Sequence, residues 1–290
     1  MRIGNKGFDI KNKCYVMGIL NVTPDSFSDG GKYTGKDQVL FRVEEMLNQG
    51  VDIIDVGGES TRPGYTIVDE QEEIERIYPV VTSIKSQFDV PVSLDTYKAN
   101  VAKSGLEAGA DMINDIWGLK YDGKIASVIA AAKVPCCLMH NRNQTVSPIN
   151  ICPRNEHVDL SYENSENRII TSVINGLTES LLLAEKAGIS ADNIVLDPGI
   201  GFGKSYEENM EILANLQCFH KLNKPLLLGT SRKSVIGLTL DLTVEERLEG
   251  TLATTALAVM KNYSFVRVHD VKENVRIIKM LEAIKAYERI

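Results

Sequence analysis

The sequence lacks the features that mark secreted, membrane-spanning and nucleic-acid-binding proteins. Its five cysteines are an odd number without a C-x-x-C pair, which argues against a disulfide framework or a zinc site and suits a reducing compartment. No stretch approaches the roughly 18 uninterrupted apolar residues of a spanning helix, and residues 1–13 hold no apolar signal core. The net charge of −7 comes without a run of five like charges, which excludes a basic groove or patch. We therefore expect a cytoplasmic protein that binds neither nucleic acid nor membrane.

What the chain does contain is an alternation of short apolar runs with longer amphipathic segments. The runs lack polar alternation at their centres, which is typical of strands buried on both faces of a parallel sheet. Expected strands lie at 14–22, 51–56, 90–96, 112–116, 134–140, 193–198, 225–231 and 264–271. Expected helices lie near 36–48, 69–86, 98–108, 122–132, 163–187, 205–216, 244–261 and 272–288. Eight strand–helix units predict a single α/β domain over residues 1–290, a (β/α)8 TIM barrel.

A doubly wound open sheet uses the same strand–helix unit and is the alternative fold. The polar residues favour the barrel, because one or more of them stands where each apolar run ends. A barrel gathers the carboxyl ends of its strands around one mouth, whereas an open sheet would spread them along an edge. These residues are Asn21, Asp55, Asp95, Asn114, His140, Asp197, Ser231 and His269.

Two segments rich in turn-forming residues follow the first two strands. GILNVTPDSFSDGG (18–31) is expected to form a long loop that covers or binds a substrate. In DVGGESTRPG (55–64), Gly57 and Gly58 are expected to let the backbone approach a ligand closely. Arg62 stands on the same segment, where a held guanidinium suits a phosphate or a carboxylate. The alternative is a solvated arginine on a turn.

Three polar side chains end later apolar runs, where an unpaired charge would be costly. Asp95, Asn114 and Asp197 offer two carboxylates and one amide, which suit the donor-and-acceptor edge of a flat heterocycle such as a pterin or purine. Met139 and Phe202 are candidates for the apolar faces above and below such a ring. The alternative for each aspartate is a cap on the helix that follows.

The last two strands end in cations and hydroxyls. LLLGTSRKSVIG (226–237) places Lys233 after the seventh strand, where barrels commonly bind phosphate. Arg267 and His269 are two residues apart on one face of the eighth strand and are expected to hold an anion, although His269 also fits a structural histidine. PGIGFGKS is not a phosphate-binding loop, because Pro198 stands where that motif needs glycine. A heterocycle with an anionic tail, such as a pterin diphosphate, matches the whole set.

Taken in order, these motifs resemble those of the dihydropteroate synthase family. The signatures GILNVTPDSFSDGG and DIIDVGGESTRPG are followed by SLDTYK, INDIWG, LMHNR, LDPGIGFGKS, GTSRKS and RVHD. The resemblance implies a cytoplasmic homodimer of TIM barrels from an enzyme class that sulfonamides target. It also implies condensation of 6-hydroxymethyl-7,8-dihydropterin diphosphate with 4-aminobenzoate, giving 7,8-dihydropteroate and pyrophosphate.

The resemblance also carries residue roles. Asp29, Arg62, Asp95 and Lys233 match catalytic positions, Asp29 and Arg62 being the pair that two loops bring over the site. The pterin positions are Asp95, Asn114, Met139, Asp197, Phe202 and Lys233. The diphosphate positions are Asn21, Arg62, Arg267 and His269, and Asn21 also matches the Mg²⁺ contact. The positions around 4-aminobenzoate are Phe27, Thr61, Pro63, Lys233 and Ser234.

Two other functions compete with this interpretation. A methyltetrahydrofolate-binding barrel would share the pterin residues, but it has no need of a diphosphate site, so Arg62, Arg267 and His269 argue against it. A catalytically silent pterin-binding paralogue is the second alternative. The chain departs from many family members after LMHNR, where it reads NQTVSPINICPRNEH. That departure leaves the shape of one rim of the mouth open.

Overall fold

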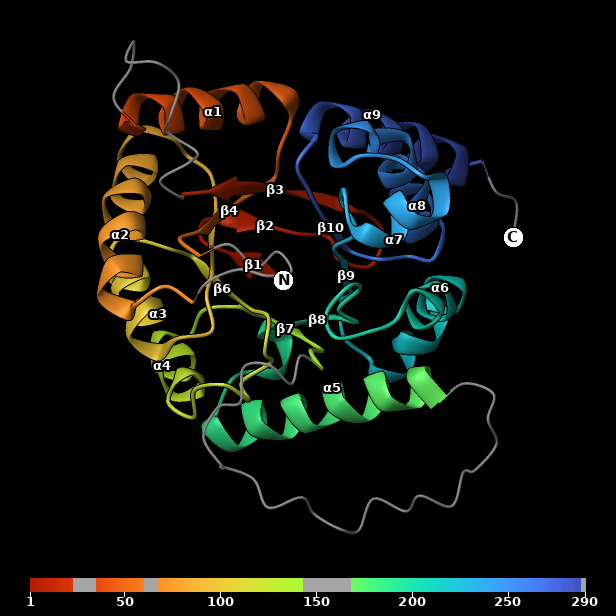
Figure 1. The fold of residues 1–290 in the computed structure, drawn as a ribbon. Coiled ribbons are helices and arrows are strands. Elements are labelled where there is room, and N and C mark those ends of the chain that lie inside the picture. Colours follow the sequence, from red (N-terminus) through yellow and green to blue (C-terminus); the bar gives the residue numbers. More distant parts are fainter. Residues whose placement is uncertain (23–34, 60–66, 143–167, 288–290) are drawn as a thin grey trace.

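The computed structural model describes residues 1–22, 35–59, 67–142 and 168–287. Each predicted apolar run overlaps one strand of an eight-stranded parallel sheet, ringed by helices (Figure 1). The strands are β3 (Tyr15–Asn21), β4 (Ile53–Gly57), β5 (Val92–Asp95), β6 (Met112–Asp115), β7 (Cys136–Met139), β8 (Ile194–Asp197), β9 (Leu227–Leu228) and β10 (Phe265–Val268). Their order is β8-β7-β6-β5-β4-β3-β10-β9, and a parallel bridge between Leu196 and Leu226 joins the two ends. The predicted TIM barrel is confirmed, and the open sheet is wrong.

The helices follow the strands as expected, with one addition. They are α1 (Gly35–Gln49), α2 (Glu70–Gln87), α3 (Ala99–Glu107), α4 (Ile125–Ala132), α5 (Arg168–Ala187), α6 (Tyr206–Ala214), α7 (Ser234–Leu240), α8 (Leu248–Met260) and α9 (Val271–Lys285). The short helix α7 was not predicted, because Gly237 interrupts its pattern. A Cβ at Gly237 would lie 2.2 Å from Arg247 Nη2, so the glycine makes room for that guanidinium. None of the helices in the described residues has the length and apolar character needed to cross a membrane.

Side chains of the strands alternate between the barrel interior and the surrounding helices, and both sides are buried. The outward Val16, Ile54 and Ile113 belong to the large cluster under the helices. The inward residues form a separate apolar cluster, composed of Met17, Ile53, Met112, Cys137, Val195, Leu227 and Phe265 together with Ile3 and Phe8. Because both faces are apolar, the strands show no polar alternation in sequence.

An N-terminal hairpin covers the end of the barrel opposite the carboxyl ends of the strands. Strands β1 (Arg2–Ile3) and β2 (Lys6–Gly7) pair antiparallel. Ile3 is fully buried against the inward side chains, and the Phe8 ring lies 5.9 Å from that of Phe265. Two-residue strands are too short to show a period, so sequence patterning did not reveal the hairpin. It leaves the opposite end of the barrel, the mouth, as the place for a site.

Candidate functional site

The predicted site residues of the central strands lie in one inward layer at the mouth. Asp95, Met139 and Asp197 are the last residues of β5, β7 and β8, and all three are buried. Asn114 lies in β6 opposite Asp95, and Arg267 lies in β10. The two-residue period of a strand puts these side chains above the inward apolar cluster, on the same face of the sheet. The barrel thus brings together residues that are up to 172 positions apart in the chain.

One guanidinium connects the polar members of this layer. Arg267 Nη2 donates to Asp95 Oδ2 at 2.5 Å, and Arg267 Nε donates to Asp55 Oδ2 at 2.6 Å. Asn114 Nδ2 donates to the same Asp55 oxygen at 3.2 Å. Arg267 was expected to hold the anionic tail of the ligand. The structure shows that it also contacts Asp95, one of the residues expected to bind the heterocycle.

Asp55 is a member of the layer to which the sequence analysis gave no role. It is completely buried, and its Oδ1 has no hydrogen-bond partner among the described residues. A buried carboxylate in this state is costly unless a neighbouring cation compensates it. The available signal was the single charge within the apolar run IIDVG, which gives no indication of its partner.

A second group of predicted residues converges beside Gly229, just after β9. Asp197 Oδ2 lies 3.5 Å from the position that a Cβ would take at Gly229, and Lys233 Nζ and the Arg267 Cβ lie 3.9 Å from it. Lys233 Nζ also donates to the Ile200 carbonyl at 2.6 Å and lies 4.5 Å from the centroid of the Phe202 ring. A glycine at this point leaves the space between the carboxylate and the ammonium open.

The helix-cap alternative for the two aspartates is wrong. Asp197 Oδ1 accepts a hydrogen bond from Gly199 N at 2.7 Å, within the turn that follows β8. The cap of α6 is Ser205, whose hydroxyl accepts from Glu208 N. Asp95 caps no helix either, because α3 begins after Lys98. Both carboxylates are therefore held at the mouth for another reason.

Hydrogen bonds also fix the basic residues after β9 and β10. His269 Nδ1 lies 3.0 Å from Ser231 Oγ, and that hydroxyl accepts from His269 N at 3.1 Å. Arg232 donates from Nε and Nη2 to the two oxygens of Asp270, at 2.9 and 2.5 Å. Arg232 precedes Lys233 and Asp270 follows His269, so this ion pair links the two loops that carry them.

Burial sets the ionisation of the charged residues in the layer. It raises the pKa of Asp95 to about 7, although Arg267 lowers it, and it raises the pKa of Asp197 against the effect of Lys233. Burial lowers the pKa of Lys233 to about 8, although Asp197 favours the ammonium. The pKa of Arg267 is raised, because its aspartate neighbours outweigh its own burial. Perturbed pKa values concentrated in one place are typical of a functional site.

An apolar wall flanks the charged residues. Met139 packs in a small cluster with Tyr97, Ile116 and Trp117, and Phe202 packs against that cluster from the loop after β8. Met139 and Phe202, predicted as the apolar faces of a ring site, are thus in the same cluster. A planar ligand edge bound by Asp197 would lie next to this wall.

The remaining predicted site residues lie outside the described residues or at the edge of the mouth. Phe27, Asp29, Thr61, Arg62 and Pro63 lie outside the described residues. Ser234 is exposed as the first residue of α7, and Asn21 is half-buried at the end of β3.

Two residues from the predicted motifs face α2 or α5 instead of a ligand. A Cβ at Gly58 would lie 2.7 Å from Ile77 Cγ2 and 2.9 Å from Glu73 Cγ, so this glycine allows α2 to pack closely. The imidazole of His140 lies against Gly176 of α5, and burial lowers the pKa of His140 to about 2. Neither observation supports a role in the mouth.

Two lysines near the mouth were missed, the half-buried Lys204 and the buried Lys98. Lys204 Nζ donates to the carbonyls of His140, Gly199 and Phe202 and so ties the loop after β8 to the end of β7. Lys98 binds two glutamates beside the end of β4. Each was visible in sequence only as one lysine in a family motif. In the described part of the chain, no group of three or more His, Cys, Asp or Glu side chains is arranged to hold a metal ion.

Comparisons with known proteins extend the resemblance suggested by the motifs. A family model described as pterin binding enzyme matches residues 17–269. The dihydropteroate synthase of Clostridium beijerinckii is 54% identical over 285 residues, which are 98% of this chain and 99% of that protein. The crystal structure of the Clostridium difficile dihydropteroate synthase in the presence of pteroic acid is 44% identical, with a TM-score of 0.86 over 98% of this chain and 100% of that one. The Yersinia pestis dihydropteroate synthase with a sulfonamide drug complex is 39% identical, with a TM-score of 0.85 over 99% of both chains.

Proposed function

Since the chain belongs to the dihydropteroate synthase family of pterin-binding enzymes, we propose specific roles for the residues at the mouth of its barrel. The enzyme condenses 6-hydroxymethyl-7,8-dihydropterin diphosphate with 4-aminobenzoate, giving 7,8-dihydropteroate and pyrophosphate for folate biosynthesis. The observation that carries the assignment of the site is the convergence of Asp197, Lys233 and Arg267 beside Gly229. The Asp197 carboxylate and the Lys233 ammonium beside Gly229, together with the guanidinium that Arg267 carries on the neighbouring strand β10, suit a ligand with both a donor edge and an anionic tail.

The pterin binds, in this proposal, to Asp95, Asn114, Asp197 and Lys233. Asp197 Oδ1 is occupied by the Gly199 amide, and no hydrogen bond from a described residue reaches its Oδ2. That oxygen can therefore accept from the amino group and ring N–H of a pterin. Met139 and Phe202 line the faces of the ring, which is supported by their packing in one apolar cluster.

The diphosphate binds to Arg267 and His269, with Arg62 from outside the described residues. Nε and Nη2 of Arg267 are bound to Asp55 and Asp95, whereas its Nη1 makes no hydrogen bond to a described residue. The Nη1 donors are therefore the ones that we assign to a phosphate oxygen. The Ser231 hydroxyl, next to His269 Nδ1, orients that imidazole. Positive charge here stabilises the pyrophosphate as the carbon–oxygen bond breaks.

Asn21 is the residue that we assign to Mg²⁺. Its side chain is half-buried at the end of β3 and makes no hydrogen bond to another described residue. Mg²⁺ commonly keeps several waters and binds through few protein oxygens together with substrate phosphates. A single amide oxygen fits that pattern better than a site enclosed by protein. When bound, the ion would neutralise charge on the leaving diphosphate.

4-Aminobenzoate is assigned to Lys233 and Ser234, together with Phe27, Thr61 and Pro63 outside the described residues. Lys233 lies over the Phe202 ring, so it borders both the pterin pocket and the start of α7. The arylamine attacks the pterin methylene carbon directly, and no protein nucleophile is needed. Asp29 and Arg62 complete the proposed catalytic set, with Asp95 and Lys233 beside the ring.

The quaternary state and location are further parts of the proposal. Apolar side chains on α7, α8 and α9 remain exposed, which supports a homodimer formed through these helices. They are Leu238, Leu240, Met260, Met280 and Ile284, exposed by 44–68%. Four cysteines of the described residues are free thiols, which suits the cytoplasm. Light scattering of the purified protein tests the dimer, and a mass of one chain would contradict it.

Pyrophosphate release is the experiment that tests the function. Purified enzyme is incubated in Mg²⁺ buffer with the pterin diphosphate, with and without 4-aminobenzoate. Release that depends on 4-aminobenzoate and yields dihydropteroate is the expected result. Tight pterin binding without any release would favour the silent paralogue and contradict the proposal.

A further inference from the structure

A cluster of buried ionisable side chains lies beside the mouth, outside the layer that holds Asp95 and Asp197. Lys98 Nζ donates to Glu59 Oε2 and to Glu73 Oε2, each at 2.7 Å. These three side chains are exposed by only 5%, 3% and 2%. The cluster joins the end of β4, the first turn of α2 and the start of α3.

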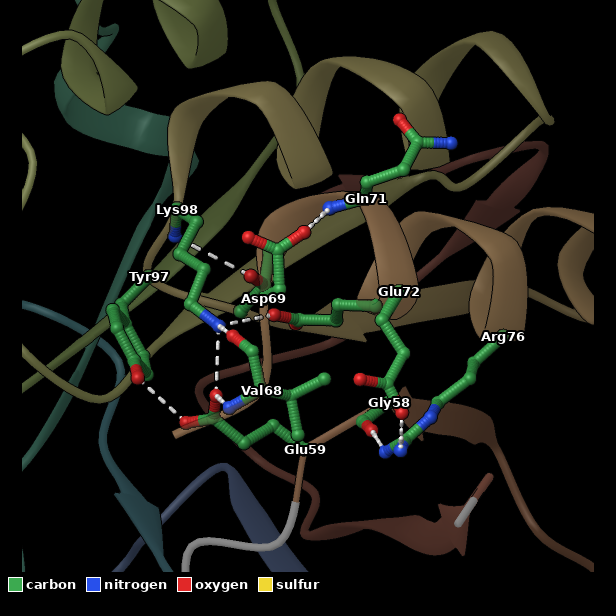
Figure 2. Close-up of polar contacts among 11 residues, drawn as sticks. Gly58, Glu59, Val68, Asp69, Gln71, Glu72, Arg76, Tyr97 and Lys98 are labelled. Atoms are coloured by element: carbon green, nitrogen blue, oxygen red, sulfur yellow. Dashed lines mark hydrogen bonds and ion pairs between the residues drawn. The ribbon is translucent and has the colours of Figure 1, made fainter. Parts of the chain in front are cut away.

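The same cluster ties together the chain on both sides of residues 60–66. Glu59 directly precedes this segment, and Val68 lies just after it. Val68 N donates to Glu59 Oε2 at 2.9 Å, and Lys98 Nζ donates to the Val68 carbonyl at 2.7 Å (Figure 2). One ammonium and one carboxylate therefore fix both flanks of the segment that carries Arg62.

Tyr97 links these flanks to the pterin side of the mouth. Its hydroxyl donates to Glu59 Oε1 at 2.5 Å, and Figure 2 shows Tyr97 and Lys98 both directed toward Glu59. Its ring packs in the apolar cluster that contains Met139. Tyr97 therefore connects Glu59 to the apolar wall of the proposed pterin pocket.

The cluster contributes little net free energy to folding, because the cost of burying its charges offsets most of their attraction. Two carboxylates share one ammonium. Burial raises the pKa of Glu73, whereas the two glutamates keep the pKa of Lys98 raised although burial lowers it. Apolar groups of similar volume often replace a buried ion pair without loss of stability. Apolar groups do not, however, fix a backbone amide and a carbonyl at hydrogen-bond distance, as Glu59 and Lys98 do for Val68.

Building on the proposed function, we propose that Lys98 is a positioning residue for residues 60–66, acting through Glu59 and Val68. It serves the step that uses 4-aminobenzoate, because Thr61 and Pro63 are assigned to that substrate and Arg62 to the leaving diphosphate. Among the described residues, those assigned to the pterin ring make no hydrogen bond to Lys98, Glu59 or Glu73. The cluster reaches the ring only through the packing of Tyr97 and the charge of Glu73 near Asp95, so binding of the bare ring should depend on it less than the step with 4-aminobenzoate does.

The test compares Lys98→Met with wild type in two assays. We expect kcat/KM for 4-aminobenzoate to fall by about tenfold or more, because a small displacement of a positioned group has effects of this size. The dissociation constant of 6-hydroxymethyl-7,8-dihydropterin should change by less than about threefold. Hydrogen exchange of the Val68 amide should become faster, because its acceptor Glu59 is no longer held.

Two further variants control for stability and charge. Lys85→Met removes a partly buried ion pair at the other end of α2 from Glu73, in which Lys85 Nζ donates to Asp111 at 2.8 Å. It should lower the melting temperature without changing kcat/KM. Tyr97→Phe removes the hydrogen bond to Glu59 without changing any charge, and it should lower kcat/KM for 4-aminobenzoate in the same direction but less. If Lys98→Met does not fold, Tyr97→Phe tests the positioning role in its place.

The outcomes separate this inference from the proposed function. Wild-type enzyme that releases no pyrophosphate contradicts the function itself. An active wild type with Lys98→Met or Tyr97→Phe equally active per folded molecule overturns the positioning role. Equal losses in pterin affinity and in kcat/KM for 4-aminobenzoate would also overturn it, because they would indicate general damage to the site.

Discussion

The guanidinium of Arg267 donates to Asp95 Oδ2 at 2.5 Å, and this contact makes the ionisation of Asp95 depend on Arg267. Burial raises the pKa of Asp95 to about 7, and Arg267 opposes that rise. The same guanidinium binds Asp55, so its loss would leave two buried carboxylates without their cation. In the proposed function, the electrostatics of the residues assigned to the pterin and of those assigned to the diphosphate therefore share the Arg267 guanidinium.

Replacing Arg267 by Met should consequently affect more than the diphosphate. Without the guanidinium, the pKa of Asp95 should rise above 7, and the affinity for the bare dihydropterin should reach its plateau at a higher pH. Loss of one partner from a buried ion pair should also lower the free energy of unfolding by about 3–5 kcal/mol. Affinity measured across about pH 6–9 checks the first effect.

Lys85→Met is the control for Arg267→Met. Lys85 forms a partly buried ion pair with Asp111 at 2.8 Å and makes no hydrogen bond to Asp95. The pH dependence of pterin affinity should therefore stay as in wild type. An Arg267→Met enzyme with the same pH dependence as wild type would show that the two residues are not coupled.

The wild-type enzyme should show a narrow pH optimum. Asp95 must lose its proton to accept from the pterin, so kcat/KM should rise with pH up to about 7. Lys233 must keep its proton, and burial lowers its pKa to about 8, so kcat/KM should fall above that pH. Each limb should approach a tenfold change per pH unit. Lys233→Arg should lose the alkaline limb, because a guanidinium does not deprotonate in this range, and an alkaline limb that persists would exclude Lys233 as its source.

Asp197→Ala should separate ligand binding from folding. Because Oδ2 of Asp197 is assigned to the pterin, its loss should weaken pterin affinity by about 100-fold, the equivalent of charge-assisted hydrogen bonds worth about 1.5–3 kcal/mol each. The melting temperature should fall only by the equivalent of one lost hydrogen bond, about 1–3 kcal/mol, because Gly199 N loses its acceptor Asp197 Oδ1. Calorimetric titration with the dihydropterin measures the first effect, and thermal denaturation measures the second.

Ser205→Ala gives the reverse pattern and serves as the control. Ser205 caps α6, and loss of such a cap costs about 1 kcal/mol of stability. Pterin affinity should stay within error of wild type. If Asp197→Ala behaved like Ser205→Ala, Asp197 would be a structural residue of the loop.

The fold was predictable because every strand of the barrel is buried on both faces. Each apolar run therefore stood out from the amphipathic helices around it, and the polar residues at the strand ends pointed to a common mouth. The hairpin at Arg2–Gly7 and helix α7 were not predictable in the same way. Their stability comes from tertiary contacts, such as those of Ile3 inside the barrel and of Arg247 over Gly237.

The site was predictable where chemistry and position coincide. Asp95, Asn114 and Asp197 end buried runs, so the barrel alone brings them together. The partners of Arg267 were not predictable, because a strand pattern does not tell which of several inward carboxylates a guanidinium will contact. The Glu59–Lys98–Glu73 cluster has the same difficulty. Its members come from three different elements, and each alone resembles an ordinary surface charge.

The Arg232–Asp270 ion pair gives a final prediction about the cationic side of the mouth. Arg232 has a left-handed φ of 57°, which costs a residue with a side chain about 1–3 kcal/mol. Arg247 Nη1 donates to its carbonyl at 3.0 Å, and the Asp270 carboxylate holds its guanidinium at two points. The conformation sets the direction in which the next residue, Lys233, leaves the turn.

Asp270→Asn should therefore lower kcat/KM for pterin diphosphate by about tenfold, because the loops that carry Lys233 and His269 lose the ion pair that connects them. Pyrophosphate release at varied pterin diphosphate measures the effect. Lys6→Met is the control, because it removes the ion pair of Lys6 with Asp52 at 3.1 Å, near the N-terminal hairpin at the opposite end of the barrel. An Asp270→Asn enzyme that loses no more activity than Lys6→Met would show that the ion pair stabilises the turn without orienting the cations.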